Sequence, residues 1–169
     1  MKPECTMAVA TSLADYAMTA LSIDATPKIT VDRFKLLLKE QHPFASILDI
    51  EILEIGCGTA LLLLPDRSSH QRLGGIVAGP MLMGLADLAL YAAIVGATGN
   101  TAAVTASLSI NFLRKAPPGG VLAHATILKT GRLAAGEVSL SPRKGGEPVA
   151  HAISTWSLPR PASAGQITG

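Results

Sequence analysis

The sequence predicts a single α+β domain in which an antiparallel sheet curls around one long, buried helix. Residues 76–97 are apolar almost all the way round, so a helix there has no face for solvent and must be covered on most sides. Four runs of alternating apolar and polar residues follow this stretch, with no helical pattern between them. Because strands do not alternate with helices along the chain, a parallel, doubly wound sheet is excluded.

The composition is that of a globular protein with much apolar surface to bury. Hydrophobic residues make up 49% of the 169 residues and charged residues only 15%, which excludes a disordered chain and favours burial between subunits. Aromatic residues are 4%, and the net charge of +2 comes from scattered Lys and Arg, so nucleic acid is not an expected partner. The two cysteines and four histidines lack the spacing of a disulfide framework or a metal site.

The chain divides into three segments. Residues 1–30 are predicted to be an N-terminal extension that is helical or loosely ordered, and residues 31–159 form the main domain. The tail, residues 160–169, is predicted to be disordered.

One helix and two strands are expected before the central helix. Thr30 is placed to cap a short amphipathic helix, which ends at His42 because Pro43 follows. Residues 47–64 then alternate in hydropathy on both sides of a Gly-Cys-Gly turn, which predicts two paired strands.

A loop rich in turn residues leads into the central helix. Pro80 suits its first turn, because the missing N–H would have no helical partner there. Gly96, Gly99 and Asn100 are expected to close it. The four strands that follow are expected at residues 101–114, 121–130, 134–141 and 149–158.

No membrane span is predicted. Residues 76–97 have spanning length, but they carry Asp87, Pro80 and three glycines and lack flanking basic anchors. The N-terminus makes a poor export signal because Asp15 interrupts its apolar run. Together with the low cysteine content, these features predict a soluble, cytoplasmic protein.

Asp87 is the single carboxylate inside the apolar helix. Burying a lone charge is costly or shifts its pKa, unless the carboxylate has partners or reaches a water-filled site. The residues alone leave two interpretations: a structural Asp satisfied by a neighbouring strand or by solvent at a helix end, or an acid that belongs to a functional site.

Three features in order point to a known family. Gly79 precedes Asp87 by eight residues, and the acid closes the triplet Leu-Ala-Asp. Residues 107–119, SLSINFLRKAPPG, form a strand that ends in an aromatic, an aliphatic and a basic residue before a Pro-rich turn, and a closing strand is expected at 150–158. Over roughly residues 49–158 the chain resembles the hotdog-fold acyl-CoA thioesterases, in particular the PaaI-type branch associated with phenylacetate breakdown.

The resemblance implies hydrolysis of a short- or medium-chain or aryl acyl-CoA, with no metal and no cofactor beyond the coenzyme A of the substrate. Asp87 matches the family's general base or nucleophile, and the Gly79 N–H matches the amide that polarises the thioester carbonyl at the helix N-terminus. Thr105 matches a hydroxyl that helps to hold the attacking water in some relatives, and is otherwise an ordinary strand residue.

The chain also departs from the family pattern. The family's His is Ala78 here and its second Gly is Pro80, which alters the turn expected to orient the substrate. Tyr91, one turn beyond the acid, is expected to bond the carboxylate, to line the acyl pocket or to pack in the core. Arg114 is a candidate for the CoA phosphates or a solvated edge residue, and Met83 either contacts substrate or fills the core.

The spacing also predicts an oligomer. Eight residues of helix, at about 1.5 Å each, place Gly79 and Asp87 roughly 12 Å apart, so one thioester carbon cannot lie near both within one chain. The site therefore needs Asp87 of one subunit and Gly79 of another, with two helices antiparallel across a two-fold axis. We expect an obligate homodimer or a dimer of dimers.

Two other function classes stay open. Without the family's His, the chain also fits a hotdog protein that binds acyl-CoA with little turnover. A hydratase or dehydratase on the same fold is the third class, although such enzymes usually pair a His with an acid and no His lies near Gly79 in the sequence.

Overall fold

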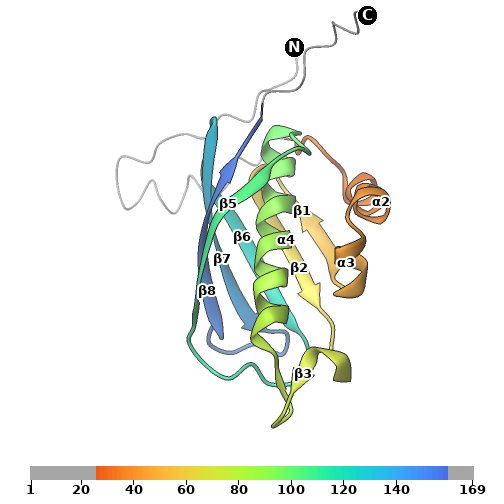
Figure 1. Cartoon of the computed structure of the whole chain (residues 1–169), viewed down its shortest axis with the longest axis vertical. Coiled ribbons are helices and arrows are strands. Elements are labelled where there is room, and N and C mark those ends of the chain that lie inside the picture. Colours follow the sequence, from red (N-terminus) through yellow and green to blue (C-terminus); the bar gives the residue numbers. More distant parts are fainter. Residues whose placement is uncertain (1–25, 160–169) are drawn as a thin grey trace, which may run out of the picture.

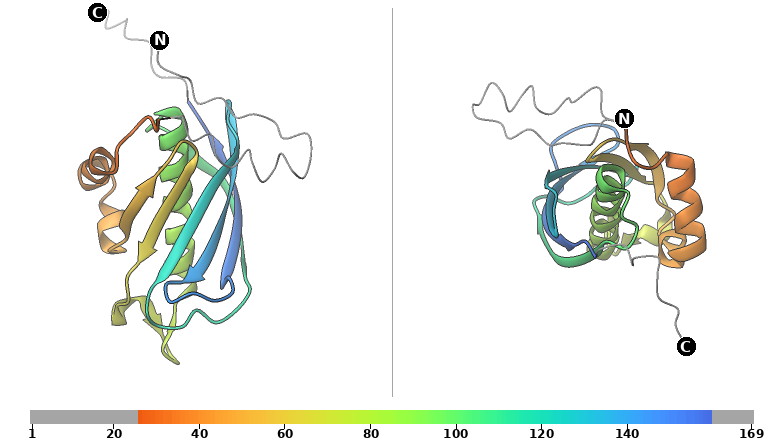
Figure 2. Two further views of the ribbon diagram at one scale, coloured as in Figure 1. Left: turned by 180° about the vertical axis from the view of Figure 1, so that it is seen from behind. Right: turned by 90° about the horizontal axis from the view of Figure 1, so that it is seen from above.

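The computed structural model describes residues 26–159 and confirms the α+β architecture (Figure 1). A six-stranded antiparallel sheet curls around helix α4 (Gly79–Thr98), which lies inside the curl when the molecule is seen from above (Figure 2). The N-terminal extension was predicted over residues 1–30, and its residues 1–25 fall outside the described residues, as does the disordered tail predicted over residues 160–169.

All six strands expected from hydropathy alternation are present, and they pair in the order β1-β2-β6-β7-β8-β5. The first strand after the central helix, β5, therefore lies at the edge of the sheet. Within residues 26–159 its only neighbouring strand is β8, so no described strand pairs with the backbone groups on its other side. The strands are β1 (Glu51–Ile55), β2 (Thr59–Leu64), β5 (Val104–Phe112), β6 (Val121–Lys129), β7 (Leu133–Pro142) and β8 (Ala150–Ser157).

The apolar character of α4 is explained by its burial in the core. The helix is long and apolar enough to cross a membrane, but 67% of its most apolar window is buried inside the protein. From Leu85 to Ala97 only Asp87 and Leu88 are not fully buried. A helix enclosed on most sides has no need of a polar face, so α4 is the core helix of a soluble domain.

The helix that precedes the sheet is followed by a second one that was not predicted. Thr30 caps α2 (Val31–Gln41) by accepting a hydrogen bond from the Arg33 backbone N–H at 3.3 Å, as expected. His42 ends α2, but Pro43 then opens the five-residue helix α3 (Pro43–Ile47), because proline is favoured at a first helical position. Both helices lie together on one side of the molecule, beside β1 (Figure 1).

The start and the end of α4 differ in detail from the prediction. The preceding loop contains a short 3-10 helix, η1 (Ser68–His70), and a two-stranded hairpin of β3 (Gln71–Arg72) and β4 (Ile76–Val77). Ile76 and Val77 therefore belong to the hairpin, and the helix begins only at Gly79. At the other end, Gly99 in the left-handed conformation (φ 71°) closes the helix, whereas Gly96 lies inside it.

The expectation that the cysteines take no part in a disulfide was wrong for Cys57. It lies half-buried in the turn between β1 and β2 and is disulfide-bonded. Cysteine content therefore gives no support to a cytoplasmic location, which stays a prediction.

Gly96 allows α4 to approach the β1–β2 turn, and this contact can be tested. A Cβ at Gly96 would overlap the Gly56 carbonyl oxygen and lie 2.8 Å from Cγ2 of Ile55. We expect Gly96→Ala to lower the free energy of unfolding by about 2 kcal/mol, which lowers Tm by roughly 4–8 °C.

The control for this variant is Lys35→Ala at an exposed position of α2, which we expect to shift Tm by no more than about 1 °C. A raised Tm in Gly96→Ala, the result that alanine's higher helix propensity alone would give, contradicts the close contact.

Candidate active site

Asp87 has a single hydrogen-bond partner among the described residues, and that partner comes from the edge strand. The Thr105 hydroxyl donates to Asp87 Oδ1 at 2.8 Å. Oδ2 of the same carboxylate has no hydrogen-bond partner among residues 26–159. Thr105 on β5 thus holds Oδ1, and Oδ2 is available to bind a further group.

A β-bulge directs Thr105 toward the helix. The partly buried residues on β5 are Thr105, Leu108 and Ile110. The alternation of buried and exposed side chains is therefore interrupted between Thr105 and Leu108. The register with β8 shifts at that point, between Thr105 and Ser107. Because an extra residue reverses the alternation of side chains, the bulge turns Thr105 to the face that contacts α4.

The surroundings of Asp87 disfavour the charged form of its carboxyl group. Burial raises the pKa of Asp87 above 3.8, and the hydrogen bond from Thr105 offsets part of that rise. A carboxyl with a raised pKa in a concave site is typical of a general base, although structural acids show the same shift.

Asp87 and Thr105 lie in the wall of a cavity of about 310 Å³. Its wall is formed by the α2–α3 junction, α4, the start of β5 and one residue of β8, so four separate parts of the chain meet there. The lining residues are His42, Phe44, Ala45, Leu48, Gly84, Asp87, Leu88, Tyr91, Ala103, Val104, Thr105 and Trp156.

Tyr91 lines this cavity but does not bond the carboxylate. Its hydroxyl donates to the Thr101 backbone carbonyl at 2.8 Å, and its ring stacks on Trp156 with centroids 6.0 Å apart. Tyr91 therefore packs in the core, and of the three alternatives the bond to Asp87 is contradicted.

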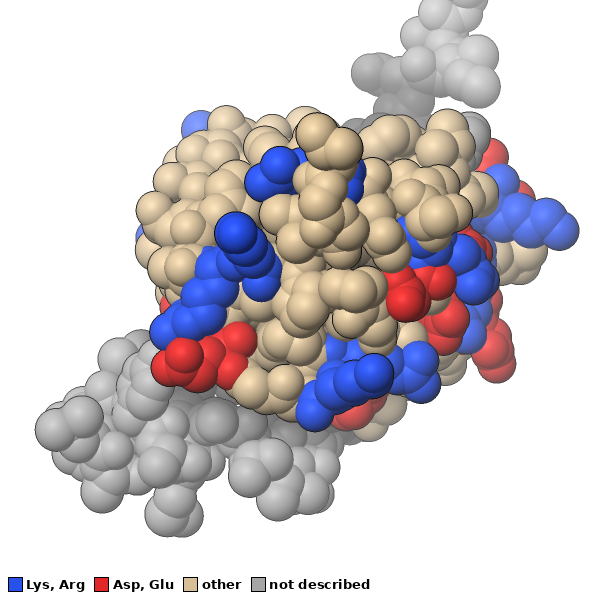
Figure 3. Space-filling view, turned by 90° about the horizontal axis from the view of Figure 1, so that it is seen from below, with Lys and Arg blue, Asp and Glu red and all other residues tan. Residues whose placement is uncertain are grey.

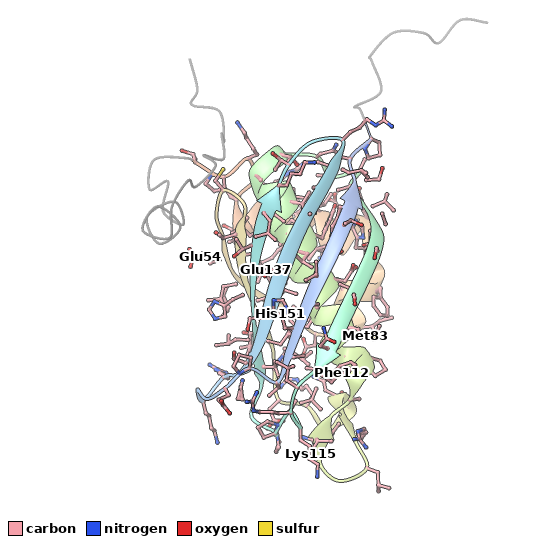
Figure 4. All side chains as sticks on the ribbon, turned by 90° about the vertical axis from the view of Figure 1, so that its left-hand side faces the viewer. Glu54, Met83, Phe112, Lys115, Glu137 and His151 are labelled. Atoms are coloured by element: carbon pink, nitrogen blue, oxygen red, sulfur yellow. The ribbon has the colours of Figure 1, made fainter. Side chains whose placement is uncertain are left out.

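The other predicted site residues lie away from the cavity. Gly79 opens α4 next to the ring of Phe112, and Figure 4 shows Met83 near that ring at the same end of the sheet. Ala78 and Pro80 flank Gly79 at the helix start. One chain therefore does not bring the Gly79 amide into the cavity that holds Asp87.

The amide of Gly79 has no hydrogen-bond partner among the described residues. Its neighbours do: the Ala78 N–H donates to the His70 carbonyl at 2.8 Å, and the Met81 N–H donates to Ala78 at 3.0 Å. An unpaired amide at the N-terminus of a 20-residue helix can donate to an anion or a polarised carbonyl.

Basic side chains lie at the end of the molecule that carries β3 and β4, in separate groups around uncharged surface (Figure 3). Arg114 is one of the exposed basic residues. It forms an ion pair with Glu147 at 2.8 Å and donates to the Pro148 carbonyl at 3.0 Å. Among the described residues no group of three or more His, Cys, Asp or Glu side chains could hold a metal ion.

His42 and Trp156 are lining residues that sequence reasoning missed. His42 was assigned only as the end of a helix, and Trp156 only as part of a strand. Neither has a motif around it, and both reach the cavity because α3 and β8 fold against α4.

Comparisons with known proteins agree with this architecture. The thioesterase superfamily model matches residues 74–135. A candidate thioesterase from Silicibacter is 31% identical, covers 79% of this chain and 94% of its own, and superposes with a TM-score of 0.71. Zebrafish thioesterase superfamily member 2 is 26% identical over 78% of this chain and 99% of its own, with a TM-score of 0.70.

The E. coli PaaI protein, from the phenylacetic acid degradation operon, shares the fold at 21% identity, a TM-score of 0.67 and coverage of 75% of this chain and 91% of its own. No curated protein sequence matches the chain. The chain belongs to the thioesterase superfamily and has the hotdog fold.

The hydrogen bond between Thr105 and Asp87 can be tested by titration. Thr105→Val keeps the shape of the side chain but removes the donor that lowers the pKa of Asp87. We therefore expect the pKa of this carboxyl to rise further in Thr105→Val and to stay close to wild type in Thr105→Ser. The carboxyl carbon shift of Asp87, followed by NMR against pH, measures both, and identical pKa values in all three proteins contradict the bond.

Proposed function

We propose that this chain hydrolyses a short- or medium-chain or aryl acyl-CoA at a site shared by two subunits. The observation that carries the proposal is the Asp87–Thr105 pair, which places an ionisable acid in the wall of a largely apolar cavity of a thioesterase superfamily member. Such a cavity suits an acyl group, and the acid suits activation of water or direct attack on the thioester carbon.

Asp87 acts through its unpaired oxygen. Thr105 fixes Oδ1, so Oδ2 is the atom left to take a proton from water or to attack the thioester. The raised pKa of Asp87 makes its carboxylate a stronger base, and the group remains ionised once the pH exceeds that pKa. Below that pH the carboxyl is protonated and the rate falls.

The Gly79 amide supplies the second requirement, a donor to the carbonyl oxygen as it gains negative charge. Because this amide lies outside its own chain's cavity, we assign it to the cavity of a second copy. The free edge of β5 supports such a dimer, because it can pair with a second copy. Large apolar side chains exposed along and just after this strand also support it: Val104 (59% exposed), Phe112 (52%) and Leu113 (51%).

The remaining predicted residues then have proposed roles at the same interface. Ala78, Pro80 and Met83 surround the Gly79 amide and would border the thioester of the partner's cavity. Arg114 would exchange its ion pair with Glu147 for a CoA phosphate, which offers more charge and more acceptor oxygens than one carboxylate.

One observation keeps the hydratase alternative in view. His42 lines the same cavity as Asp87, so the fold pairs a His with the acid although no His lies near Gly79 in the sequence. Hydration of a 2-enoyl-CoA by wild type, seen as loss of the conjugated absorbance, favours that alternative over hydrolysis.

Asp87→Asn keeps the volume of the side chain and an oxygen for Thr105 but removes the base. We expect thioester hydrolysis over a panel of acyl-CoAs to fall by about 10²-fold or more while the dimer stays intact. Release of free thiol measures the rate, and light scattering measures the assembly. Equal rates in wild type, Asp87→Asn and Asp87→Ala contradict the assignment and favour a protein that binds acyl-CoA with little turnover.

Division of the site between subunits has its own test, in which Asp87→Asn is co-expressed with Gly79→Pro. Each variant alone is expected to be inactive, because one lacks the base and the other lacks the amide. In a mixed dimer one of the two sites combines an intact Asp87 with an intact Gly79, so random pairing restores about one quarter of wild-type activity.

Gly79→Ala is the matched control, since it adds a side chain near Phe112 but keeps the N–H, and it should retain most of the activity. No recovery in the mixed dimers, with both variants folded and able to exchange subunits, contradicts a shared site.

A further inference from the structure

Two buried polar side chains are not used by the proposed hydrolysis. His70 is 3% exposed and Ser154 is 1% exposed. Apart from Tyr91 and Trp156, they are the polar side chains that the described part of the chain buries. A buried polar group costs free energy unless it is hydrogen-bonded, and both of these donate to a backbone carbonyl. Each therefore stabilises one particular conformation of the backbone that it contacts.

Ser154 lies beside the β-bulge that aims Thr105 at Asp87. Its hydroxyl donates to the Ser107 carbonyl at 2.6 Å. Ser107 is the first residue after the register shift between β5 and β8. A bulge breaks the regular pairing of two strands locally, so a side-chain bond across it helps to fix its backbone. The conformation of the bulge in turn decides to which face of the sheet Thr105 points.

His70 holds the loop that leads into α4. Its ring Nδ1 lies 3.0 Å from the Pro65 carbonyl, which can only accept, so Nδ1 carries a proton whatever the charge of the ring. Pro65 is buried directly after β2, whereas residues 66–69 between the two are exposed. The ring therefore ties the far end of an exposed loop to the sheet.

The backbone of His70 carries this anchor to the start of α4. Its carbonyl accepts the N–H of Ala78, the residue before Gly79, at 2.8 Å. Ala78 has no side chain that could cap the helix, so bonds to neighbouring segments must hold the helix start. A second anchor is the Val77 N–H, which donates to the Ala116 carbonyl at 3.0 Å. These two bonds fix the chain just before the Gly79 amide.

We propose that Ser154 and His70 are positioning residues, one for each half of the proposed site. Ser154 fixes the bulge that holds Thr105 against Asp87. His70 fixes the position of the Gly79 amide at the start of α4. The effect of both is indirect but large, because a displacement of about 1 Å in a catalytic group can lower a rate by about 10²-fold. The assignment rests on the proposed function, because it takes Asp87 and Gly79 as the catalytic groups.

Ser154→Ala tests the first half through the pKa of Asp87, followed by NMR titration of its carboxyl carbon. Without the hydroxyl the bulge should relax and Thr105 should lose its bond to the carboxyl, so we expect this pKa to rise as in Thr105→Val. Ala152→Gly is the matched control, because it also removes one heavy atom from the buried face of β8 but no hydrogen bond. It should leave the pKa at its wild-type value. An unchanged pKa of Asp87 in Ser154→Ala overturns the assignment of Ser154.

His70→Asn and His70→Leu test the second half. The amide nitrogen of Asn, like Nδ1 of His, is bonded to Cγ and can donate to the Pro65 carbonyl, whereas Leu cannot. Because the Gly79 amide acts on charge that develops in the transition state, we expect kcat to fall by about tenfold or more in His70→Leu with little change in KM. The Asn variant should stay within about threefold of wild type. If His70 contributed only apolar packing, Leu would be the better replacement, and that order of rates overturns the assignment of His70.

Relaxation of the ¹⁵N nucleus of Gly79 provides a measurement that needs no turnover. We expect the amide to be as ordered in His70→Asn as in wild type and more mobile in His70→Leu. His70→Gln, whose amide lies one carbon further from the backbone, should behave like His70→Leu, so the test does not depend on that variant folding. Equal order of the Gly79 amide in all of these proteins overturns the assignment of His70.

The two NMR measurements also separate this assignment from the proposed function. Absence of acyl-CoA hydrolysis, with the Asp87 titration and the Gly79 relaxation both responding as expected, contradicts the proposed function alone. Hydrolysis by wild type, with neither signal altered in Ser154→Ala and His70→Leu, contradicts the positioning roles alone.

Discussion

Burial of α4 inside the curled sheet is the constraint on which the rest of this structure depends. Such burial requires the helix backbone to come close to the strands, and glycines make the approach possible. Gly96 faces the Gly56 carbonyl, and Gly136 on β7 leaves room for Leu90, whose Cδ2 lies 2.9 Å from the position of a Cβ there. With the helix enclosed, removal of apolar surface from water stabilises the domain, and almost no polar group is tolerated along it.

Asp87 is the exception, and its surroundings show how the fold accommodates it. The acid lies on the part of α4 that faces the edge strand, where the sheet has not fully closed over the helix. One bulge in β5 supplies Thr105 as a partner for one carboxylate oxygen. The cost of burial is thus offset only in part, which agrees with a pKa that remains raised.

The site divides into two parts with different physical origins. The cavity beside Asp87 is built within one chain, because Leu48 at the end of α3 packs onto α4 at Gly84 and α3 places Phe44 in the same wall as the acid. The oxyanion donor is proposed to come from a second chain, because a straight helix keeps its N-terminus away from its own middle. His151 and Glu137 form a separate pair at 3.2 Å on the outer face of the sheet (Figure 4). Neither residue lines the cavity beside Asp87.

The periodicity of hydropathy along the sequence determined most of the fold. All six strands, the capped helix after Thr30 and the buried helix follow from local patterns, because each pattern reflects which side of the element is buried. Leu-Ala-Asp and its spacing from Gly79 also singled out the acid. Only the tertiary structure decided that α3 exists, that a bulge aims Thr105 at Asp87, and that His42 and Trp156 share one cavity. These features arise from contacts between segments far apart in the chain, which no local pattern encodes.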